Sequence, residues 1–557
     1  MTGSREASMV VLSLFFIFAI AQFKFAPCVR ADGENKRLLD LWRESDGITV
    51  VALGDSITAG VGLREPQKEC YTALLSSMLA KWLAPTRVRL IAYGIPGATA
   101  DVGLREIEGV LKYSPDLVLI QFGGNDSRLR RPIDEIRNNL IGMIKTLRDR
   151  SKAAILLIVP PFQTPAPNSP VAEAIRVVAK ECGVIVADFD KVLHEYEHDF
   201  RGWFSPPPSH PGEYSHVLMA KELWNALLQL VGVEPSLDVH IGSGVTWVTE
   251  SSSIDIPVAI LNRSRKAMDV NVIVEHAGVW HNWLMAVDAS SSAQPKLKVK
   301  PPMESSLRFV REQITAIARC SEDFGWDVKW ATWTPAFYCD KDGMWLGERR
   351  IDGWLEFATN EHVVMGRNRW RGPDDLSFRM RFERTKDGEA LNLTISVRDD
   401  VVVVKPTWDF SCLLSGDCVE VFIDHRPIHQ QGKPFFSKDV TMIAIVPGSN
   451  SVRIASWYFD EVEPTFSAPS GRWLRARLKG EFTASGYDVE LTIPLAIFNG
   501  LPAVSFDVLV DDTDDRSGRK AQMAAFGWED DFRNTSPFAL LLFKRLKTLP
   551  RWRLAVN

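Results

Sequence analysis

Residues 49–60 read Thr-Val-Val-Ala-Leu-Gly-Asp-Ser-Ile-Thr-Ala-Gly, so that a β-branched apolar run passes directly into a turn bounded by glycines. The run predicts a buried strand, and the turn at residues 54–60 leads toward a helix. Ser56 therefore stands at the carboxyl end of a strand, where α/β sheets build their sites. Taken alone, the turn also fits a Gly-Ser turn in which Ser56 caps a helix. It is not the Gly-x-Ser-x-Gly elbow of the α/β-hydrolase fold.

Short apolar runs alternate with helical periodicity from Ile48 to Val231, which is typical of βαβ units that build a parallel sheet. The predicted strands are residues 49–53, 88–92, 117–122, 154–159 and 184–187. The predicted helices, with apolar residues three to four apart, are residues 67–83, 101–111, 133–147, 170–179 and 213–230. Residues 36–233 are therefore expected to form a three-layer α/β domain with a parallel sheet.

Three further segments are expected at the same edge of that sheet as Ser56. Residues 93–99 (Tyr-Gly-Ile-Pro-Gly-Ala-Thr) follow the second strand and residues 123–126 (Gly-Gly-Asn-Asp) follow the third, while Ser209-His210-Pro211 comes just before the last helix. A nucleophilic serine needs a base, and a tetrahedral oxyanion needs several preorganised donors. The convergence of these residue types indicates an active site rather than a capping turn.

On these segments, residues 48–231 resemble the SGNH, or GDSL, hydrolase family. The four residues that name the family match Ser56, Gly97, Asn125 and His210, in that order. The resemblance implies a nucleophilic serine and a histidine base that act on esters without a metal. It also implies an oxyanion hole formed by the N–H groups of Ser56 and Gly97 and the side-chain amide of Asn125.

The sequence departs from the family pattern at Pro207, where Asp-x-x-His would place an acid three residues before His210. A proline side chain cannot orient an imidazole, and replacing the acid of a catalytic triad lowers turnover by roughly 10^4-fold. Either a backbone carbonyl or another acid serves His210, or activity is low. The nearest acids on the N-terminal side are Asp188, Asp190 and Asp199.

Two other histidine positions carry weaker signals. His216, six residues after His210, is interpreted as a surface or packing residue. His194 and His198 stand four residues apart and would share one helix face, but without a third ligand a solvated face is favoured over a metal site.

The hydrophobic pattern changes after Gly232, where alternating apolar and polar residues replace the helical periodicity. Residues 234–315 are expected to form a small, Ig-like β-sandwich, residues 316–344 a linker or part of a neighbouring domain, and residues 345–547 a second β-sandwich. Tryptophan marks the same boundary: four of the 18 precede residue 234 and fourteen follow it.

The last predicted domain resembles the family 9 carbohydrate-binding module, through the segments Val397-Arg-Asp-Asp400, Gly416–Asp424, Asp488–Pro494 and Asp511–Asp515. The resemblance implies a β-sandwich that binds sugars and, in some members, structural calcium. Most tryptophans are expected to be core, but Trp457 and Trp528 stand beside polar residues and are the candidates for stacking on sugars. The acidic run Asp511–Asp515 is a candidate for calcium, with a solvated turn as the alternative.

The N-terminus predicts export. Arg5 precedes the apolar run Met9–Ala21, which suits the core of a signal peptide better than a bilayer span, and residues 1–31 are expected to be removed. The alternative is an uncleaved N-terminal anchor. Export allows disulfides, and Cys320 with Cys339 and Cys412 with Cys418 are candidate pairs. A net charge of -5 over 557 residues argues against nucleic-acid binding.

Together these features predict a secreted, periplasmic or cell-envelope serine esterase that removes acyl groups, with acetyl expected, from a polysaccharide, with no cofactor for catalysis and no membrane span after signal cleavage. Two alternatives stay open. One is a polysaccharide O-acyltransferase, and the other is a glycan-binding protein whose hydrolase domain is weakly active or inactive because of Pro207.

Overall fold

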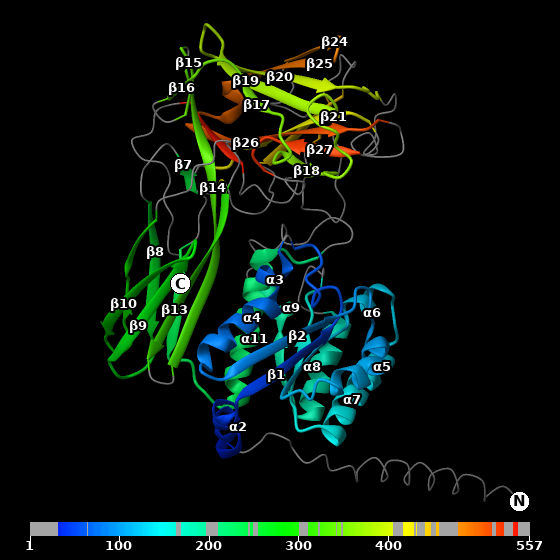
Figure 1. The fold of residues 1–557 in the computed structure, drawn as a ribbon, viewed down its shortest axis with the longest axis vertical. Helices are drawn as coiled ribbons and strands as arrows, with labels where there is room; N and C mark the ends of the chain where they lie inside the picture. The colour runs from blue at the N-terminus through cyan, green and yellow to red at the C-terminus, as the bar shows by residue number, and fades with distance from the viewer. Residues whose placement is uncertain are drawn as a thin grey trace, which may run out of the picture. The chain divides into compact units, whose positions relative to one another are not determined.

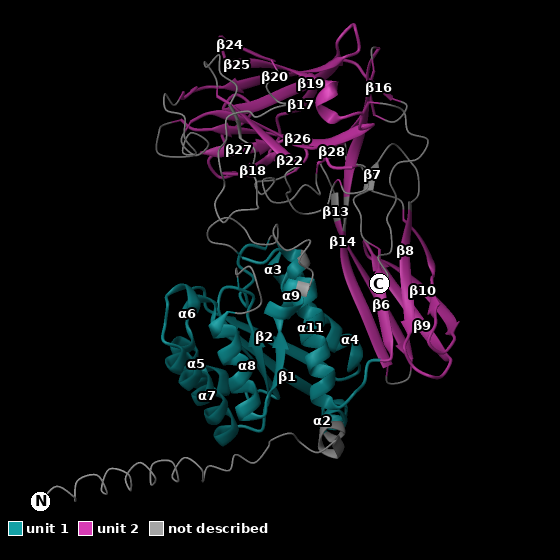
Figure 2. Ribbon diagram, turned by 180° about the vertical axis from the view of Figure 1, so that it is seen from behind, with its two compact units in different colours: residues 1–197, 206–235 teal, residues 198–205, 236–557 magenta. Residues whose placement is uncertain are grey.

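The computed structural model describes residues 32–63, 65–162, 169–195, 210–242, 246–248, 254–299, 310–320, 323–340, 342–346, 349–404, 416–427, 431, 440–446, 453–455, 477–514, 520–527 and 538–543. The chain forms two compact units, coloured separately in Figure 2. Unit 1 contains residues 1–197 and 206–235, and unit 2 contains residues 198–205 and 236–557. Among the described helices, none is long and apolar enough to cross a membrane.

Unit 1 contains a five-stranded parallel sheet, as the sequence predicts, and the structure arranges its strands in the order β2-β1-β3-β4-β5. The strands are β1 (Gly47–Gly54), β2 (Arg87–Gly94), β3 (Leu117–Gln121), β4 (Ala154–Val159) and β5 (Ile185–Asp188). The six residues of β4 are all buried, because helices cover both faces of the sheet and leave no polar face on the central strands.

The helices of unit 1 are α2 (Asp32–Glu44), α3 (Pro66–Glu69), α4 (Tyr71–Trp82), α5 (Ala100–Leu111), α6 (Gly124–Arg128), α7 (Ile133–Arg150), α8 (Pro170–Cys182), α9 (Phe189–Glu195) and α11 (Glu213–Val231). Helices α5, α7 and α8 pack on one face of the sheet around a core that includes Leu53, Ile120 and Leu157, and α4 and α11 pack together on the other face (Figure 1). The predicted helix at residues 67–83 is divided at Cys70, whose extended backbone separates α3 from α4. The sequence did not predict α2, α6 or α9.

Unit 2 is β-rich. Its strands are β6 (Leu237–Ile241), β7 (Thr246–Val248), β8 (Ile254–Asn262), β9 (Met268–His276), β10 (Val279–Val287), β11 (Ser292–Ala293), β12 (Lys296–Val299), β13 (Val310–Cys320), β14 (Asp323–Asp340), β15 (Gly343–Leu346), β16 (Arg349–Ile351), β17 (Leu355–Phe357), β18 (Val363–Met365), β19 (Leu376–Arg384), β20 (Ala390–Asp399), β21 (Cys418–Asp424), β22 (Val440–Ile445), β23 (Arg453–Ala455), β24 (Arg477–Thr483), β25 (Gly486–Pro494), β26 (Ala503–Asp512), β27 (Ala521–Ala524) and β28 (Ala539–Leu542), with a short 3-10 helix at Leu495–Phe498. They form sheets of 14, 5 and 4 strands.

The 18-residue strand β14 joins two parts of the 14-stranded sheet. Its first half pairs with β13, and its second half pairs with β15 and β28. Trp333 packs into one hydrophobic cluster with residues of β6, β8 and β9, while Phe337 packs into another with residues of β19, β20 and β26. The described residues of the stretch 316–344, which the sequence left unassigned, therefore lie mostly in β13, β14 and β15, and the division into two separate β-sandwiches stays a prediction.

The predicted pairing of Cys320 with Cys339 is wrong, because both cysteines are free. Cys320 lies opposite Asp323 at the hairpin between β13 and β14, whereas Cys339 lies near the far end of β14. At about 3.3 Å of rise per strand residue the two are about 50 Å apart, and a disulfide needs Cα atoms within about 7 Å. Cys412 lies outside the described residues, so its pairing with Cys418 stays a prediction.

Replacing Phe337 with alanine should destabilise unit 2 alone. The ring is fully buried, so its loss should lower the free energy of unfolding by about 3–5 kcal/mol. Denaturant unfolding followed by tryptophan fluorescence reports mainly unit 2, since fourteen tryptophans follow residue 233, and the far-ultraviolet helix signal reports unit 1. The matched control is Phe482→Ala, because Phe482 is 55% exposed. If the unfolding transition seen by the helix signal shifted by the same amount, units 1 and 2 would not unfold independently.

Candidate active site

The strand register brings the predicted site segments to one edge of the sheet. Gly54, the last residue of β1, is paired with Gly94 at the end of β2 and with Gln121 at the end of β3. The loops that follow these strands therefore start at the same level. Two contacts tie them together: the N–H of Ile95 donates to the carbonyl of Gly54 at 2.9 Å, and the N–H of Ala100 donates to the carboxylate of Asp126 at 3.1 Å.

Ser56 and His210 are in direct contact. Nε2 of the His210 ring lies 2.8 Å from Oγ of Ser56, although 154 residues separate them in the sequence. In the tautomer that carries its proton on Nδ1, Nε2 accepts the hydrogen bond of the serine hydroxyl. This is the contact through which an imidazole can remove a proton from an attacking serine.

A network of polar side chains holds the turn that carries Ser56. The N–H of Ile57 donates to the Asp55 carboxylate at 2.9 Å, and the hydroxyl of Thr58 lies 2.8 Å from both the Tyr71 hydroxyl and Oε1 of Gln121. These side chains are buried, so the hydrogen bonds are shielded from water. The sequence reasoning missed this network. The signal that could have revealed it is the polar Gln121 at the end of the otherwise apolar β3.

Asn125 is oriented from both ends of its amide. Its Nδ2 donates to the carbonyl of Ala98 at 2.9 Å, and the guanidinium of Arg128 donates to its Oδ1 at 3.2 Å. Asn125 is thereby joined to the loop that carries Gly97, whose φ of +80° suits glycine. Within the described part of the chain, the N–H groups of Ser56 and Gly97 have no acceptor. The two N–H groups are thus available as donors of the kind that an oxyanion requires, whereas Nδ2 of Asn125 already donates to Ala98.

Two buried carboxyls lie behind these donors. The pKa of Asp55 is raised from 3.8 to about 6, chiefly by burial and to a smaller extent by the charge of Asp126, while the N–H of Ile57 opposes the shift. Burial also raises the pKa of Asp126, which accepts the N–H of Ala100 at the start of α5. Asp55 Oδ2 lies 3.5 Å from Nδ2 of Asn125. Sequence reasoning assigned neither carboxyl to the site.

The structure gives other partners to two of the three acids considered for His210. Arg176 donates to Asp188 at 2.7 Å and to Asp190 at 3.4 Å, and Asp190 also accepts the N–H of Phe162. Asp199 and Pro207 lie outside the described residues. What orients the far side of the His210 ring therefore stays open between a backbone carbonyl and an acid other than these two.

His216 is a buried packing residue and not a surface one. Its ring stacks on Tyr71 at 5.9 Å and accepts the N–H of Tyr71 at Nδ1. Burial lowers the pKa of His216 from 6.5 to about 3, with a smaller contribution from the charge of His210. His194 packs against Asp190 through Nδ1, and its predicted neighbour His198 lies outside the described residues.

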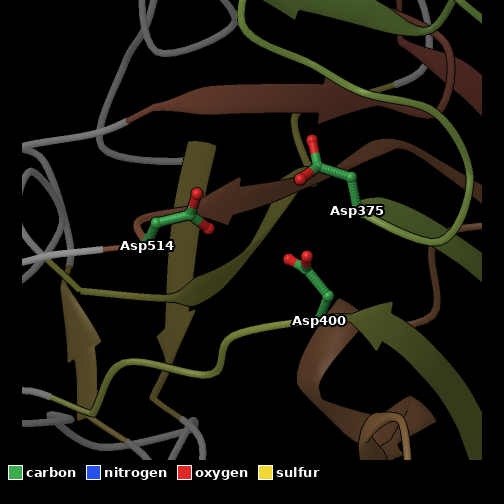
Figure 3. A group of neighbouring side chains, drawn as sticks. All are labelled: Asp375, Asp400 and Asp514. Carbon is green, nitrogen blue, oxygen red and sulfur yellow. The ribbon is translucent and has the colours of Figure 1, made fainter.

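Two groups of carboxylates in unit 2 have the spacing of a metal site. The group of Asp375, Asp400 and Asp514 (Figure 3) is bridged by Arg371, and by Lys520 at Asp375 and Asp514, so two cations already offset most of its negative charge. The predicted acidic run divides: Asp514 belongs to this group, Asp511 accepts a hydrogen bond from Gln522, and Asp515 lies outside the described residues.

The second group consists of Asp399, Asp417 and Asp512, each at most 3% exposed, with carboxylate oxygens within 4.8 Å of one another. Neither oxygen of Asp512 has a hydrogen-bond partner, nor does Oδ2 of Asp399 or the buried hydroxyl of Thr513. One cationic side chain of the described residues reaches this group: Nζ of Lys520 lies 3.5 Å from Asp512. Burial and the neighbouring carboxylates raise the pKa of Asp417 to about 8. Buried, unpartnered oxygens of this kind fit a hard cation such as calcium.

Trp457 and Trp528, the candidates for sugar stacking, lie outside the described residues. Their role stays a prediction.

Residues 52–218 match the model of the GDSL-like Lipase/Acylhydrolase family. An arylesterase from Vibrio mimicus is 32% identical over 109 residues, which are 19% of this chain and 52% of the arylesterase, so the chain spans about half the length of that relative. Esterase TesA from Pseudomonas aeruginosa is 25% identical over 199 residues, which are 35% of this chain and 94% of TesA. The family match and these two esterases support a carboxylic ester hydrolase.

Two solved structures are also similar to unit 1. The crystal structure of TesA matches with a TM-score of 0.28 at 26% identity and covers 33% of this chain and 99% of that chain. The crystal structure of Axe2, an acetylxylan esterase from Geobacillus stearothermophilus, matches with a TM-score of 0.29 at 22% identity. The match covers 34% of this chain and 95% of the Axe2 chain.

Replacing Asp55 with asparagine should stabilise unit 1 near neutral pH. The raised pKa means that the folded state binds the Asp55 proton more tightly than the unfolded state does. The stability that this proton provides is present below about pH 4 and is lost as the pH rises through about 6. Asp55→Asn should therefore raise the free energy of unfolding by up to about 3 kcal/mol at pH 7.5 and by little at pH 4. Denaturant unfolding, monitored through the far-ultraviolet helix signal, measures the free energy of unfolding at both pH values.

The matched control for this experiment is Asp149→Asn, because Asp149 is exposed at the end of α7 and should change stability little at either pH. An Asp55→Asn advantage of the same size at pH 4 and pH 7.5 would show that the carboxyl does not titrate as described.

Proposed function

We propose, on the premise that residues 52–218 form a domain of the GDSL-like lipase/acylhydrolase family, that this chain is a serine esterase whose nucleophile is Ser56. The observation that carries the proposal is the 2.8 Å contact between Oγ of Ser56 and Nε2 of His210. This contact joins a serine that follows β1 to a histidine 154 residues later in the sequence. A serine that only capped a helix would not require such a contact.

The reaction divides between the two residues. His210 takes the hydroxyl proton as Ser56 attacks the ester carbonyl, and it then returns that proton to the departing alcohol. The N–H groups of Ser56 and Gly97 and the amide of Asn125 stabilise the oxyanion that forms. Water then attacks the acyl-serine, with His210 again as base, and releases the acid. No metal takes part in these steps.

We further propose that the substrate is an acylated polysaccharide, with acetyl as the acyl group, and that the protein acts outside the cytoplasm, either secreted or in the cell envelope. The apolar run Met9–Ala21 supports export, and the β-rich unit 2 offers a scaffold that holds a polymer. Holding the polymer on the same chain as Ser56 raises the local concentration of its ester groups.

Replacing Ser56 with alanine should abolish the reaction. The expected loss in kcat is at least about 10^3-fold, since only oxyanion stabilisation and binding would remain. Acetate release from acetylated xylan or mannan and labelling by a fluorophosphonate probe measure it. The matched control is Ser151→Ala, because Ser151 follows α7, where its hydroxyl donates to the carbonyl of Leu147 and accepts the N–H of Ala153.

The same experiment separates the alternatives. Equal rates for the wild type and Ser56→Ala would refute the assignment of the nucleophile. Glycan binding without probe labelling would favour a glycan-binding protein with an inactive hydrolase domain. Probe labelling with acyl transfer to a glycan acceptor that outpaces hydrolysis would favour an O-acyltransferase.

We also propose that the buried group of Asp399, Asp417 and Asp512 binds a structural calcium ion. Three buried carboxyls so close together cannot all be ionised without a cation, and the single amine of Lys520 also pairs with two carboxylates of the other group. Calcium takes several oxygen ligands in flexible geometry, and the unpartnered oxygens of Asp399 and Asp512 are available as ligands.

Calcium should therefore raise the melting temperature of unit 2, and a chelator should reverse the effect. At a free concentration one hundred times its dissociation constant, the ion should add about 2.7 kcal/mol to the free energy of unfolding. Asp512→Asn should abolish the response, whereas Asp400→Asn, in the group of Asp375, Asp400 and Asp514, should retain it. Loss of the response in Asp400→Asn alone would move the site to the group shown in Figure 3.

A further inference from the structure

Gly62 lies against His210. A Cβ atom on residue 62 would stand 3.1 Å from Cβ of His210 and 3.8 Å from Cγ, and the backbone of Gly62 has a φ of +92°. Contacts below 3.4 Å are tighter than nine in ten real Cβ contacts, so any larger residue would require His210 to move by a few tenths of an ångström. The loop that carries the nucleophile therefore also contacts the base at the atom from which its ring projects.

The position of Gly62 is tied to that of Ser56. The N–H of Val61 donates to the carbonyl of Ser56 at 2.9 Å. The N–H of Gly60 donates to the carbonyl of Ile57 at 3.1 Å, and the N–H of Leu63 donates to the carbonyl of Gly60 at 3.2 Å. These bonds make residues 56–63 a succession of tight turns. Gly62 and Ser56 thus lie in one hydrogen-bonded loop, and His210 contacts Ser56 and leaves no free space for a side chain at Gly62.

We infer that Gly62 is a positioning residue for His210, which sets how closely the imidazole approaches the Ser56 hydroxyl. The inference rests on the proposed function. A hydrogen bond of 2.8 Å weakens steeply with displacement and misalignment, and misplacing a reacting group by about 1 Å can lower the rate about 10^2-fold. The position of Gly62 beside His210 matters more in this chain than in a chain with an Asp-x-x-His segment, because Pro207 has no side-chain acceptor for the ring.

Gly62→Ala should lower kcat at least about 10-fold, leave KM nearly unchanged and slow fluorophosphonate labelling to the same extent. The matched control is Gly60→Ala, in the same loop. Gly60 also has a positive φ, of +72°, but its Cβ would meet Pro66 and Cys70 instead of His210. The Gly60 variant carries backbone strain and a tighter contact, 2.9 Å to Cβ of Pro66, so a larger loss of kcat in Gly62→Ala than in Gly60→Ala measures the contact with His210. Equal kcat values for the two variants would overturn the inference.

A double-mutant cycle tests whether Gly62 acts through the ring of His210. In a His210→Ala background, which removes the ring, Gly62→Ala should cause no further loss of labelling rate. A further loss equal to that in the wild-type background would show a general distortion of the loop and overturn the inference. If His210→Ala alone leaves the rate unchanged, the proposed function fails instead, so the two failures are distinguishable.

Gly62→Asn covers the case in which the alanine variant folds poorly. Asparagine tolerates positive φ better than alanine does, yet it carries the same Cβ. It should restore the melting temperature while keeping the loss in kcat. Recovery of full activity together with stability would show that backbone strain, and not the contact with His210, caused the loss.

Discussion

The parallel pairing of β1 with β2 and β3 is the constraint on which the site depends. Because Gly54 is in register with Gly94 and Gln121, the turn of Ser56, the loop of Gly97 and helix α6 with Asn125 all begin at one level of the sheet. A shift of β1 by one residue would turn its side chains to the opposite face and move Ser56 away from the other loops. Strands buried on both faces resist such a shift, since apolar contacts hold them from either side.

Burial of polar groups is the second theme of unit 1. Asp55, Asp126, Gln121 and His216 are all buried around the turn of Ser56, and each donates or accepts hydrogen bonds that tie one element to another. Such groups cost free energy when they are buried, which the raised pKa of Asp55 and the lowered pKa of His216 reflect. In return they hold the nucleophile loop in one conformation, a requirement for donors that must be in place before an oxyanion forms.

In unit 2, buried side chains also join elements that are distant in the sequence. Strand β14 contributes Trp333 to one hydrophobic cluster and Phe337 to another, so a single strand couples two parts of the 14-stranded sheet. The carboxylates of Asp399, Asp417 and Asp512 come from β20, from the residue before β21 and from the end of β26. A cation bound among them would join three segments that lie far apart in the sequence.

The sequence by itself determined the five parallel strands and most helices of unit 1, because a buried parallel strand must be apolar throughout. It also predicted that the polar segments of the candidate site follow the strand ends directly. It did not determine α6 or α9, which are too short for a periodic signal. Nor did it determine the path of β14, which separates Cys320 from Cys339, or the burial of His216 against Tyr71. Only the tertiary structure decided which residues meet across long separations, such as Gly62 with His210 or Asp399 with Asp512. Those contacts depend on packing between distant elements, and local patterns of hydrophobicity and charge carry no record of it.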